Sequence, residues 1–175
     1  MRKEIEKLLQ SVQKPARYAG GELNSVMKDK SKVALRYAFC FPDTYEIGMS
    51  HLGMKILYGV ANAREDTWCE RVFAPADDME ALMRANGEPL FALESGDPIK
   101  DFDMIGFTMQ YELSYTNILN MLDLAGVPLR AEDRKSLTPI VAFGGPCACN
   151  PEPVAAFADI ILLGEGEETT NTVLD

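Results

Sequence analysis

Glycine-rich segments follow two consecutive apolar runs of the sequence, where a backbone can approach a ligand closely. Gly144-Gly145-Pro146 follow one run and Gly164-Glu165-Gly166 follow the next. Glycine permits a positive φ or a close approach of other atoms. Turn chemistry explains each segment alone, since acids such as Glu165 suit the first turn of a helix. Their occurrence at neighbouring run ends favours a binding site, to which Asn150 belongs.

A further polar segment, GFTMQYELSYTN at 106–117, is dense in hydroxyl and amide side chains. We expect Thr108, Gln110 and Tyr111 to hydrogen-bond a large polar ligand, with an aromatic ring covering its flat face. For Ser114, ligand contact and plain helix capping remain two open interpretations.

Apolar runs alternate with helical patterns along the chain. The runs at 32–41, 67–74, 103–109, 139–145 and 159–164 predict strands, with a short extra edge strand or hairpin at 89–93 and a first helix at 2–13. Steps of four and three residues mark intervening helices, for example Leu52, Ile56, Val60 and Ala63. Gly87 and Gly126 predict the ends of the two helices that precede them. Strand-then-helix units predict an α/β, flavodoxin-like, doubly wound parallel sheet of order 2-1-3-4-5. Such a sheet binds ligands beyond the carboxyl ends of its strands, which adds Pro42, Asp43 and Tyr45 to the expected contacts.

Several familiar functions of such a sheet are disfavoured. The first loop, FPDTYEIG, lacks the crowded Ser, Thr and Gly of a flavin-phosphate site, and G-x-G-x-x-G is absent. The third and fifth run ends lack the Asp and Lys of a phospho-accepting receiver domain. The four cysteines form no C-x-x-C pair, so neither a metal site nor a disulfide framework is expected.

Charge is distributed unevenly. Residues 1–36 carry nine Lys or Arg against four Asp or Glu, whereas residues 37–175 carry eight against 23. An acidic body disfavours nucleic acid as a partner, and we expect the basic arm at 1–31 to dock on this body or on another part of the protein. No run has the length of a membrane span or the character of a signal peptide, so we expect a cytoplasmic location and no membrane partner.

Three long segments carry a family resemblance: KPARYAGGELNSVMKD, FCFPDTYEIGMSHLGMKILY and FGGPCACNPEPVAAFADIILLGEGEE. They resemble the N-terminal region of bacterial cobalamin-binding-like radical S-adenosylmethionine (SAM) proteins, over nearly the whole chain. The resemblance implies a cobalamin-binding-like domain at 32–175, followed in the full protein by a radical SAM domain. That domain would hold a [4Fe-4S] cluster and SAM through C-x-x-x-C-x-x-C. Because this motif is absent here, we expect a fragment that is inactive alone and whose partner is its own C-terminal radical SAM domain, with the substrate unspecified.

Two functions remain open on this resemblance. In one, the domain holds cobalamin for methyl or radical transfer. In the other, it has lost the cofactor and serves as a lid, a substrate-recognition surface or a protein-interaction platform. Cobalamin domains that ligate cobalt through histidine carry D-x-H-x-x-G, but here His51 is flanked by Met49 and Met54. We therefore expect His51 not to bind cobalt, and Gly145→Val to abolish cobalamin binding with little effect on thermal stability.

Overall fold

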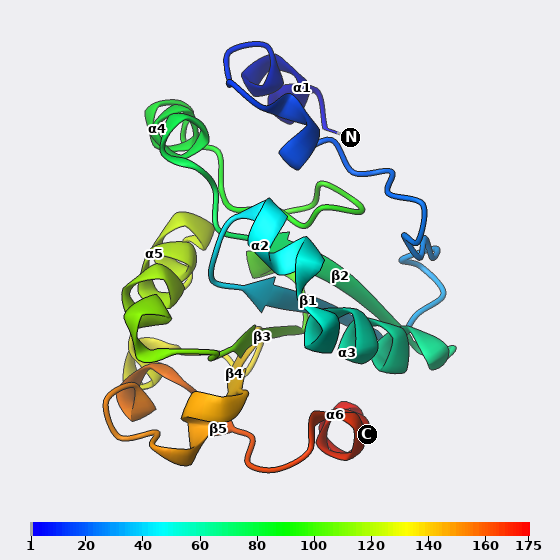
Figure 1. Ribbon diagram of the computed structural model, residues 1–175, viewed down its shortest axis with the longest axis vertical. Helices are drawn as coiled ribbons and strands as arrows, with labels where there is room; N and C mark the ends of the chain where they lie inside the picture. The colour runs from blue at the N-terminus through cyan, green and yellow to red at the C-terminus, as the bar shows by residue number, and fades with distance from the viewer. Residues whose placement is uncertain (1) are drawn as a thin grey trace.

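Residues 2–175, which the computed structural model describes, build one parallel sheet of five strands in the order β2-β1-β3-β4-β5 (Figure 1). This confirms the flavodoxin-like fold and the strand order predicted from the alternating pattern. The strands are β1 (Leu35–Phe41), β2 (Thr67–Phe73), β3 (Met104–Thr108), β4 (Ile140–Gly144) and β5 (Ile160–Ile161). The carboxyl ends of all five lie at one edge, because each pairing is parallel.

Helices cover both faces of this sheet. Figure 1 shows α4 and α5 on one side of the strands and α3 and α6 on the other. The helices are α1 (Lys3–Leu9), α2 (Tyr45–Ser50), α3 (Leu52–Ala63), α4 (Asp77–Asn86), α5 (Tyr115–Ala125) and α6 (Gly166–Leu174). Gly87 and Gly126 take left-handed φ values of 64° and 72° and end α4 and α5, as their positions in the sequence predict. None of the helices within residues 2–175 is long and apolar enough to cross a membrane.

Short 3-10 turns connect these elements: η1 (Pro15–Arg17), η2 (Ile99–Asp101), η3 (Glu112–Ser114), η4 (Ala131–Asp133), η5 (Pro146–Cys149) and η6 (Ala155–Phe157). The first helix ends at Leu9, earlier than the expected 13. The segment 89–93 forms no strand of the sheet. Its Phe91 makes one antiparallel bridge with Pro98, which is a local hairpin contact.

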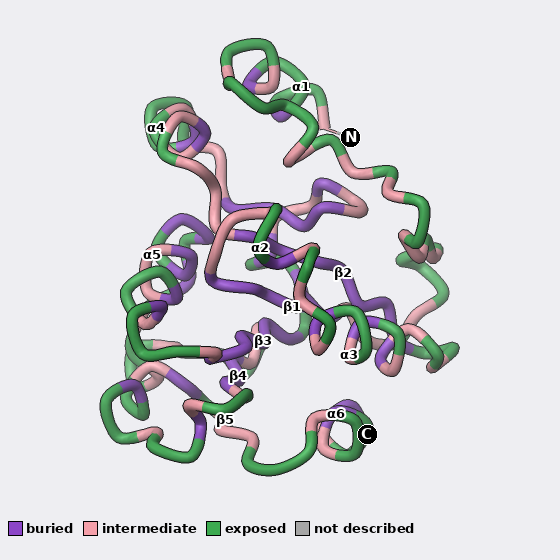
Figure 2. The backbone as a smooth tube through the Cα atoms, viewed as in Figure 1, coloured by how far each residue is buried: buried purple, intermediate pink, exposed green. Residues whose placement is uncertain are grey.

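The strands separate two apolar cores. Successive side chains of a strand point to opposite faces, so Tyr37, Phe39 and Phe41 pack on the α3 side while Ala38 and Cys40 pack on the α4 and α5 side. Figure 2 shows most of β1 to β4 as buried, whereas β5 is intermediate. Burial on both faces explains why these runs are apolar without strict alternation.

The buried face of α3 differs from the apolar stripe that marks the helix in the sequence. Leu52 and Ile56 of that stripe are 68% and 39% exposed, whereas Met54, Tyr58 and Ala61 face the sheet. Apolar residues lie on more than one side of α3, so its sequence contains two competing apolar stripes. The sequence therefore locates the helix but does not settle its orientation.

The basic N-terminal arm packs against the acidic body. Arg17 Nε donates to Glu46 Oε1 at 2.9 Å. The buried Arg71 of β2 donates to Glu94 Oε1 at 2.6 Å and also lies 3.3 Å from Glu22 Oε2 of the arm. The carboxylates hold the Arg71 charge in place, since a buried guanidinium needs paired acids.

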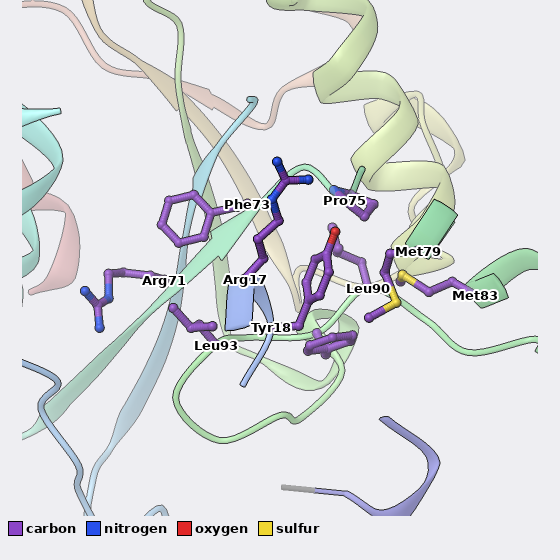
Figure 3. Close-up of a pocket in the computed structure, with 10 residues that line it drawn as sticks. Arg17, Tyr18, Arg71, Phe73, Pro75, Met79, Met83, Leu90 and Leu93 are labelled. Carbon is purple, nitrogen blue, oxygen red and sulfur yellow. The ribbon is translucent and has the colours of Figure 1, made fainter. Parts of the chain in front are cut away.

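Two further side chains fix the arm. Figure 3 shows the Tyr18 ring beside Pro75, Met79 and Leu90, and its hydroxyl accepts the Ala76 N–H at 3.0 Å. Lys28 Nζ donates to the carbonyl oxygens at positions 62, 64 and 67, at 2.9, 2.5 and 2.6 Å. The arm thus covers the turn between α3 and β2.

Candidate functional site

A cavity of about 450 Å³ opens at the carboxyl edge of the sheet, on the side that α3 and α6 cover. Strand residues Tyr37, Phe39, Gly106 and Ala142 line it, together with the turns after β3, β4 and β5 and residues of α3 and α6. This volume lies within the range of about 300 to 1,000 Å³ that is typical of small-molecule sites. The cavity also lies at the strand ends where an open parallel sheet binds ligands.

Eight of the fourteen residues predicted for the site line this cavity, within the chain that the structure describes. They are Thr108, Gln110, Gly144, Gly145, Pro146, Gly164, Glu165 and Gly166. They come from three separate turns, which the parallel pairing of β3, β4 and β5 brings to one place. Topology alone was sufficient to gather them.

The remaining six, Pro42, Asp43, Tyr45, Tyr111, Ser114 and Asn150, lie outside the cavity lining. The Tyr111 hydroxyl donates to Asp43 Oδ2 at 2.7 Å, and the Pro42 carbonyl accepts from the Asn117 amide at 3.0 Å. Asp43 lines a different, polar groove beside the arm and the start of α4.

Three of these six have their own local contacts. The Tyr45 hydroxyl donates to Glu22 at 3.2 Å, which joins α2 to the arm. The buried Ser114 hydroxyl donates to the Tyr111 carbonyl oxygen at 2.7 Å, so it serves the turn before α5 rather than the cavity. Asn150 is exposed at the end of η5.

The turn after β4 requires glycine for its own geometry. Gly145 has φ 98° and ψ −178°, a region that side-chain-bearing residues rarely adopt. A Cβ at Gly145 would lie 3.0 Å from both the amide nitrogen and the carbonyl oxygen of Met109. Both Met109 atoms already form hydrogen bonds and cannot move away freely. The Met109 N–H donates to the Gly144 carbonyl at 2.7 Å, and the Cys147 N–H donates to the Met109 carbonyl at 3.0 Å. This geometry predicts that Gly145→Val lowers thermal stability, contrary to the expectation from the sequence.

Gly144 lines the cavity and does not take a positive φ. It lies two residues after Ala142 on β4 and therefore shares its face of the sheet. A Cβ there would meet only Leu162, at 3.6 Å, which is ordinary contact. Gly164 has φ 106°, and a Cβ on it would meet no atom within 4 Å, so this glycine serves the turn that leads into α6.

His51 lines the cavity as the N-cap residue of α3. Its Nδ1 accepts the Met54 N–H at 3.2 Å, and its ring lies 5.2 Å from that of Phe41. A neutral imidazole whose Nδ1 accepts a hydrogen bond carries its proton on Nε2. The cap contact gives His51 a structural role at the cavity wall.

Sequence reasoning missed the floor of the cavity. Tyr37 is 9% exposed, and its ring stacks on that of Phe39 with centroids 5.7 Å apart and planes 25° apart. A Cβ on Gly106 would lie 2.7 and 2.9 Å from Cε2 and Cζ of Tyr37. The Tyr37 ring therefore lies directly over Gly106. A glycine inside a strand indicates such a close approach, and this signal was available in the sequence.

The interior of the cavity is mostly apolar, with a smaller number of uncharged polar groups. Lysine and arginine are absent from its described lining, and its two carboxylates, Glu165 and Glu167, are exposed at the rim. Hydroxyls of Thr108, Thr169 and Thr170 are among the polar groups of the wall, and the Gln110 amide donates to Thr108 Oγ1. Burial raises the pKa of the Tyr37 hydroxyl well above its usual value, so that it remains a hydrogen-bond donor.

Metal binding has no ready set of side chains here. Among residues 2–175, no group of three or more His, Cys, Asp or Glu side chains lies close enough to hold a metal ion. Cys149 lines the cavity near its mouth and is exposed, whereas Cys147 is partly buried. Burial is also the main cause that raises the pKa of the Cys147 thiol.

The chain is similar to known sequences over most of its length. The model of a family described as radical SAM proteins, N-terminal, matches residues 53–175. The uncharacterized protein MJ0966 of Methanocaldococcus jannaschii is 36% identical over 81 residues, which are 45% of this chain and 16% of that protein. The chain thus spans well under a fifth of this curated relative. No solved structure matches the chain. The family match includes β2 to α6 and hence the three turns that form the cavity mouth.

Proposed function

Because this chain belongs to the family of N-terminal regions of radical SAM proteins, we propose that it is a cofactor-binding accessory domain whose ligand is a cobalamin. The observation that carries this proposal is the cavity itself, which lies at the ligand-binding edge of the fold and collects eight predicted residues. A bound cobalamin would supply methyl- or radical-transfer chemistry. The [4Fe-4S] cluster and SAM would belong to a radical SAM domain elsewhere in the protein.

The residues of the cavity fit part of such a molecule. Its floor is flat and aromatic at Tyr37 and Phe39, and its wall offers hydroxyls and an amide, so an uncharged ring system suits its interior. The wider, charged portions of a cofactor would lie in solvent beyond the rim, where Glu165 and Glu167 are exposed. Gly144 leaves room for a ring to pass the end of β4.

Ligand uptake by the full-length protein tests this function. After anaerobic cluster reconstitution, hydroxocobalamin is titrated and the retained absorbance of the corrin is measured after desalting. We expect stoichiometric uptake by the wild-type protein and by Gly59→Val, a control on α3 where a Cβ meets no atom within 4 Å. Gly144→Val fills the cavity mouth and should reduce uptake at least tenfold. No uptake by the wild-type protein would reject the cobalamin assignment.

A second candidate function rests on the exposed apolar residues of α2 and α3. Ile47, Leu52 and Ile56 are 50%, 68% and 39% exposed. Neighbouring apolar side chains on a surface favour contact with another protein domain. As a cofactor-free platform, the domain would dock its radical SAM domain or a substrate protein here. Leu52→Asp would then weaken that association, while a cavity variant such as Gly144→Val would leave it unchanged.

A further inference from the structure

A second cavity of about 450 Å³ lies between the basic arm, α2 and α3. Arm residues 22–24 and 26 form one wall, and residues of α2 and α3 together with Arg71 of β2 form the others. Within residues 2–175 it shares no lining residue with the cavity at the strand ends. Its volume is also in the range of about 300 to 1,000 Å³ that is typical of small-molecule sites. It is therefore a separate place where a ligand can bind.

The buried Arg71 guanidinium brings to this cavity a donor that the protein uses incompletely. Its Nε and Nη2 groups donate to carboxylates and to a serine hydroxyl. Among the described residues, Nη1 has only the Met49 sulfur as acceptor, at 3.3 Å, and a thioether is a weak acceptor. Arg71 is 5% exposed, and Figure 3 shows its guanidinium pointing away from Tyr18 and Pro75. A buried donor of this kind favours a stronger acceptor, which a ligand can supply.

Two further charged groups of the lining have unused hydrogen-bonding capacity. The lysine ion pairs within residues 2–175 belong to positions 14, 30 and 32, so the exposed Lys55 ammonium has none. Glu22 accepts one hydrogen bond on Oε1, from the Tyr45 hydroxyl, and two on Oε2. A carboxylate has about four acceptor positions, so Oε1 can accept one more donor.

The charges at this cavity balance one another. The cations of Arg71 and Lys55 are matched by the carboxylates of Glu22 and of Glu94, which is bonded to Arg71. A ligand with one net charge would leave that charge without compensation, which is unfavourable away from water. A zwitterion brings both a carboxylate and an ammonium and keeps the balance.

We propose that this cavity binds a zwitterionic amino acid with an apolar side chain. The ligand carboxylate accepts from Arg71 Nη1 and from the Lys55 ammonium, and the ligand ammonium donates to Glu22 Oε1. The ligand side chain packs against the aliphatic part of the lining, which consists of Leu23, Val26, Met49 and Met54. Leu23 is 99% exposed, so this contact would remove apolar surface from water.

Three probes that differ in charge test this site on the full-length protein by ligand-observed NMR titration. L-phenylalanine carries both charged groups, 3-phenylpropanoate lacks the ammonium, and 2-phenylethylamine lacks the carboxylate. L-phenylalanine should bind more tightly than either truncated probe. Lys55→Gln should weaken L-phenylalanine binding about 1.5- to 5-fold, as for an exposed ion pair, and should not weaken 2-phenylethylamine binding. Glu22→Gln should weaken L-phenylalanine binding and should not weaken 3-phenylpropanoate binding.

Gly59→Val closes the cavity without relying on charge. Gly59 belongs to the lining, and a Cβ on it would meet no atom within 4 Å, so the variant should fold like the wild type. It should weaken L-phenylalanine binding at least tenfold at an unchanged melting temperature. Lys100→Gln, which changes an exposed lysine outside both linings, and Gly144→Val are the matched controls and should keep the wild-type affinity for L-phenylalanine.

Three results would overturn the inference: no binding of L-phenylalanine, equal L-phenylalanine affinities for wild-type protein and Gly59→Val, or 3-phenylpropanoate binding as tight as that of L-phenylalanine. The two cavities can also fail separately. L-phenylalanine binding without hydroxocobalamin uptake would reject the cobalamin assignment and keep the amino acid site. Hydroxocobalamin uptake without L-phenylalanine binding would do the reverse.

Discussion

The two neighbouring glycines after β4 should respond to the same substitution in opposite ways. At Gly145, valine would have to adopt φ 98°, at a cost of about 1 to 3 kcal/mol for a non-glycine residue. Its Cβ would also press on the Met109 backbone at 3.0 Å, which adds roughly 1 to 3 kcal/mol for overpacking. At Gly144 the Cβ meets Leu162 at 3.6 Å, so Gly144→Val should change the free energy of unfolding by less than about 1 kcal/mol.

Urea denaturation and thermal melting, both followed by circular dichroism, measure this contrast. A loss of about 2 to 6 kcal/mol predicts that Gly145→Val melts about 4 to 24 °C below wild type, since 1 kcal/mol shifts the melting temperature of a domain of this size by about 2 to 4 °C. Gly144→Val should melt close to wild type and lose ligand uptake. If Gly145→Val kept the wild-type free energy of unfolding, the turn would not need glycine for its own geometry, and our reasoning on this turn would fail.

Three other perturbations have defined outcomes. Gly106→Ala should displace the Tyr37 ring and cost about 1 to 3 kcal/mol of unfolding free energy, measured by urea denaturation. His51→Ala removes the N-cap of α3 and should lower the free energy of unfolding by about 0.5 to 2 kcal/mol. The affinity for hydroxocobalamin, measured by titration, should stay unchanged. A loss of this affinity would contradict the tautomer inferred from the Met54 contact. The hydrogen bond from Arg17 lowers the pKa of Glu46 to about 2 from the usual 4.5. Because the pKa of Glu46 is lowered in the folded state, this contact stabilises the arm above pH 4.5, and the stabilisation is lost as the pH falls toward 2. In Arg17→Gln, carboxyl NMR titration should show the pKa of Glu46 returning toward 4.5. An unchanged pKa would refute the pairing.

The sheet was predictable because its order follows from local patterns and general rules. Apolar runs separated by helical steps require right-handed crossovers, and these leave few orders for five parallel strands. Gly87 and Gly126 predicted helix ends because a left-handed cap strongly favours glycine. The strand-end turns were predictable for a related reason, since the topology places them at one edge.

The interior of the site was less predictable because it depends on which neighbour fills a given space. Tyr37 and Ala142 look like ordinary core residues, yet both line the cavity that α3, α6 and the strand-end turns border. Asp43 and Tyr111 seemed ready for a ligand, yet they bond to each other. Polar residue types at a strand end thus indicate contacts without choosing between a ligand and a neighbouring side chain.

The contacts of Lys28 bear on where this protein can be divided. Helix α3 ends at Arg64 in extended backbone without a glycine cap, and the Lys28 ammonium supplies the donors that its last carbonyl groups lack. A chain begun after the basic arm would retain every strand but expose these acceptors and remove the partner of Arg71 at Glu22. Because the arm supplies these contacts, grafting or recombining this domain should keep residues 14–32 with the sheet.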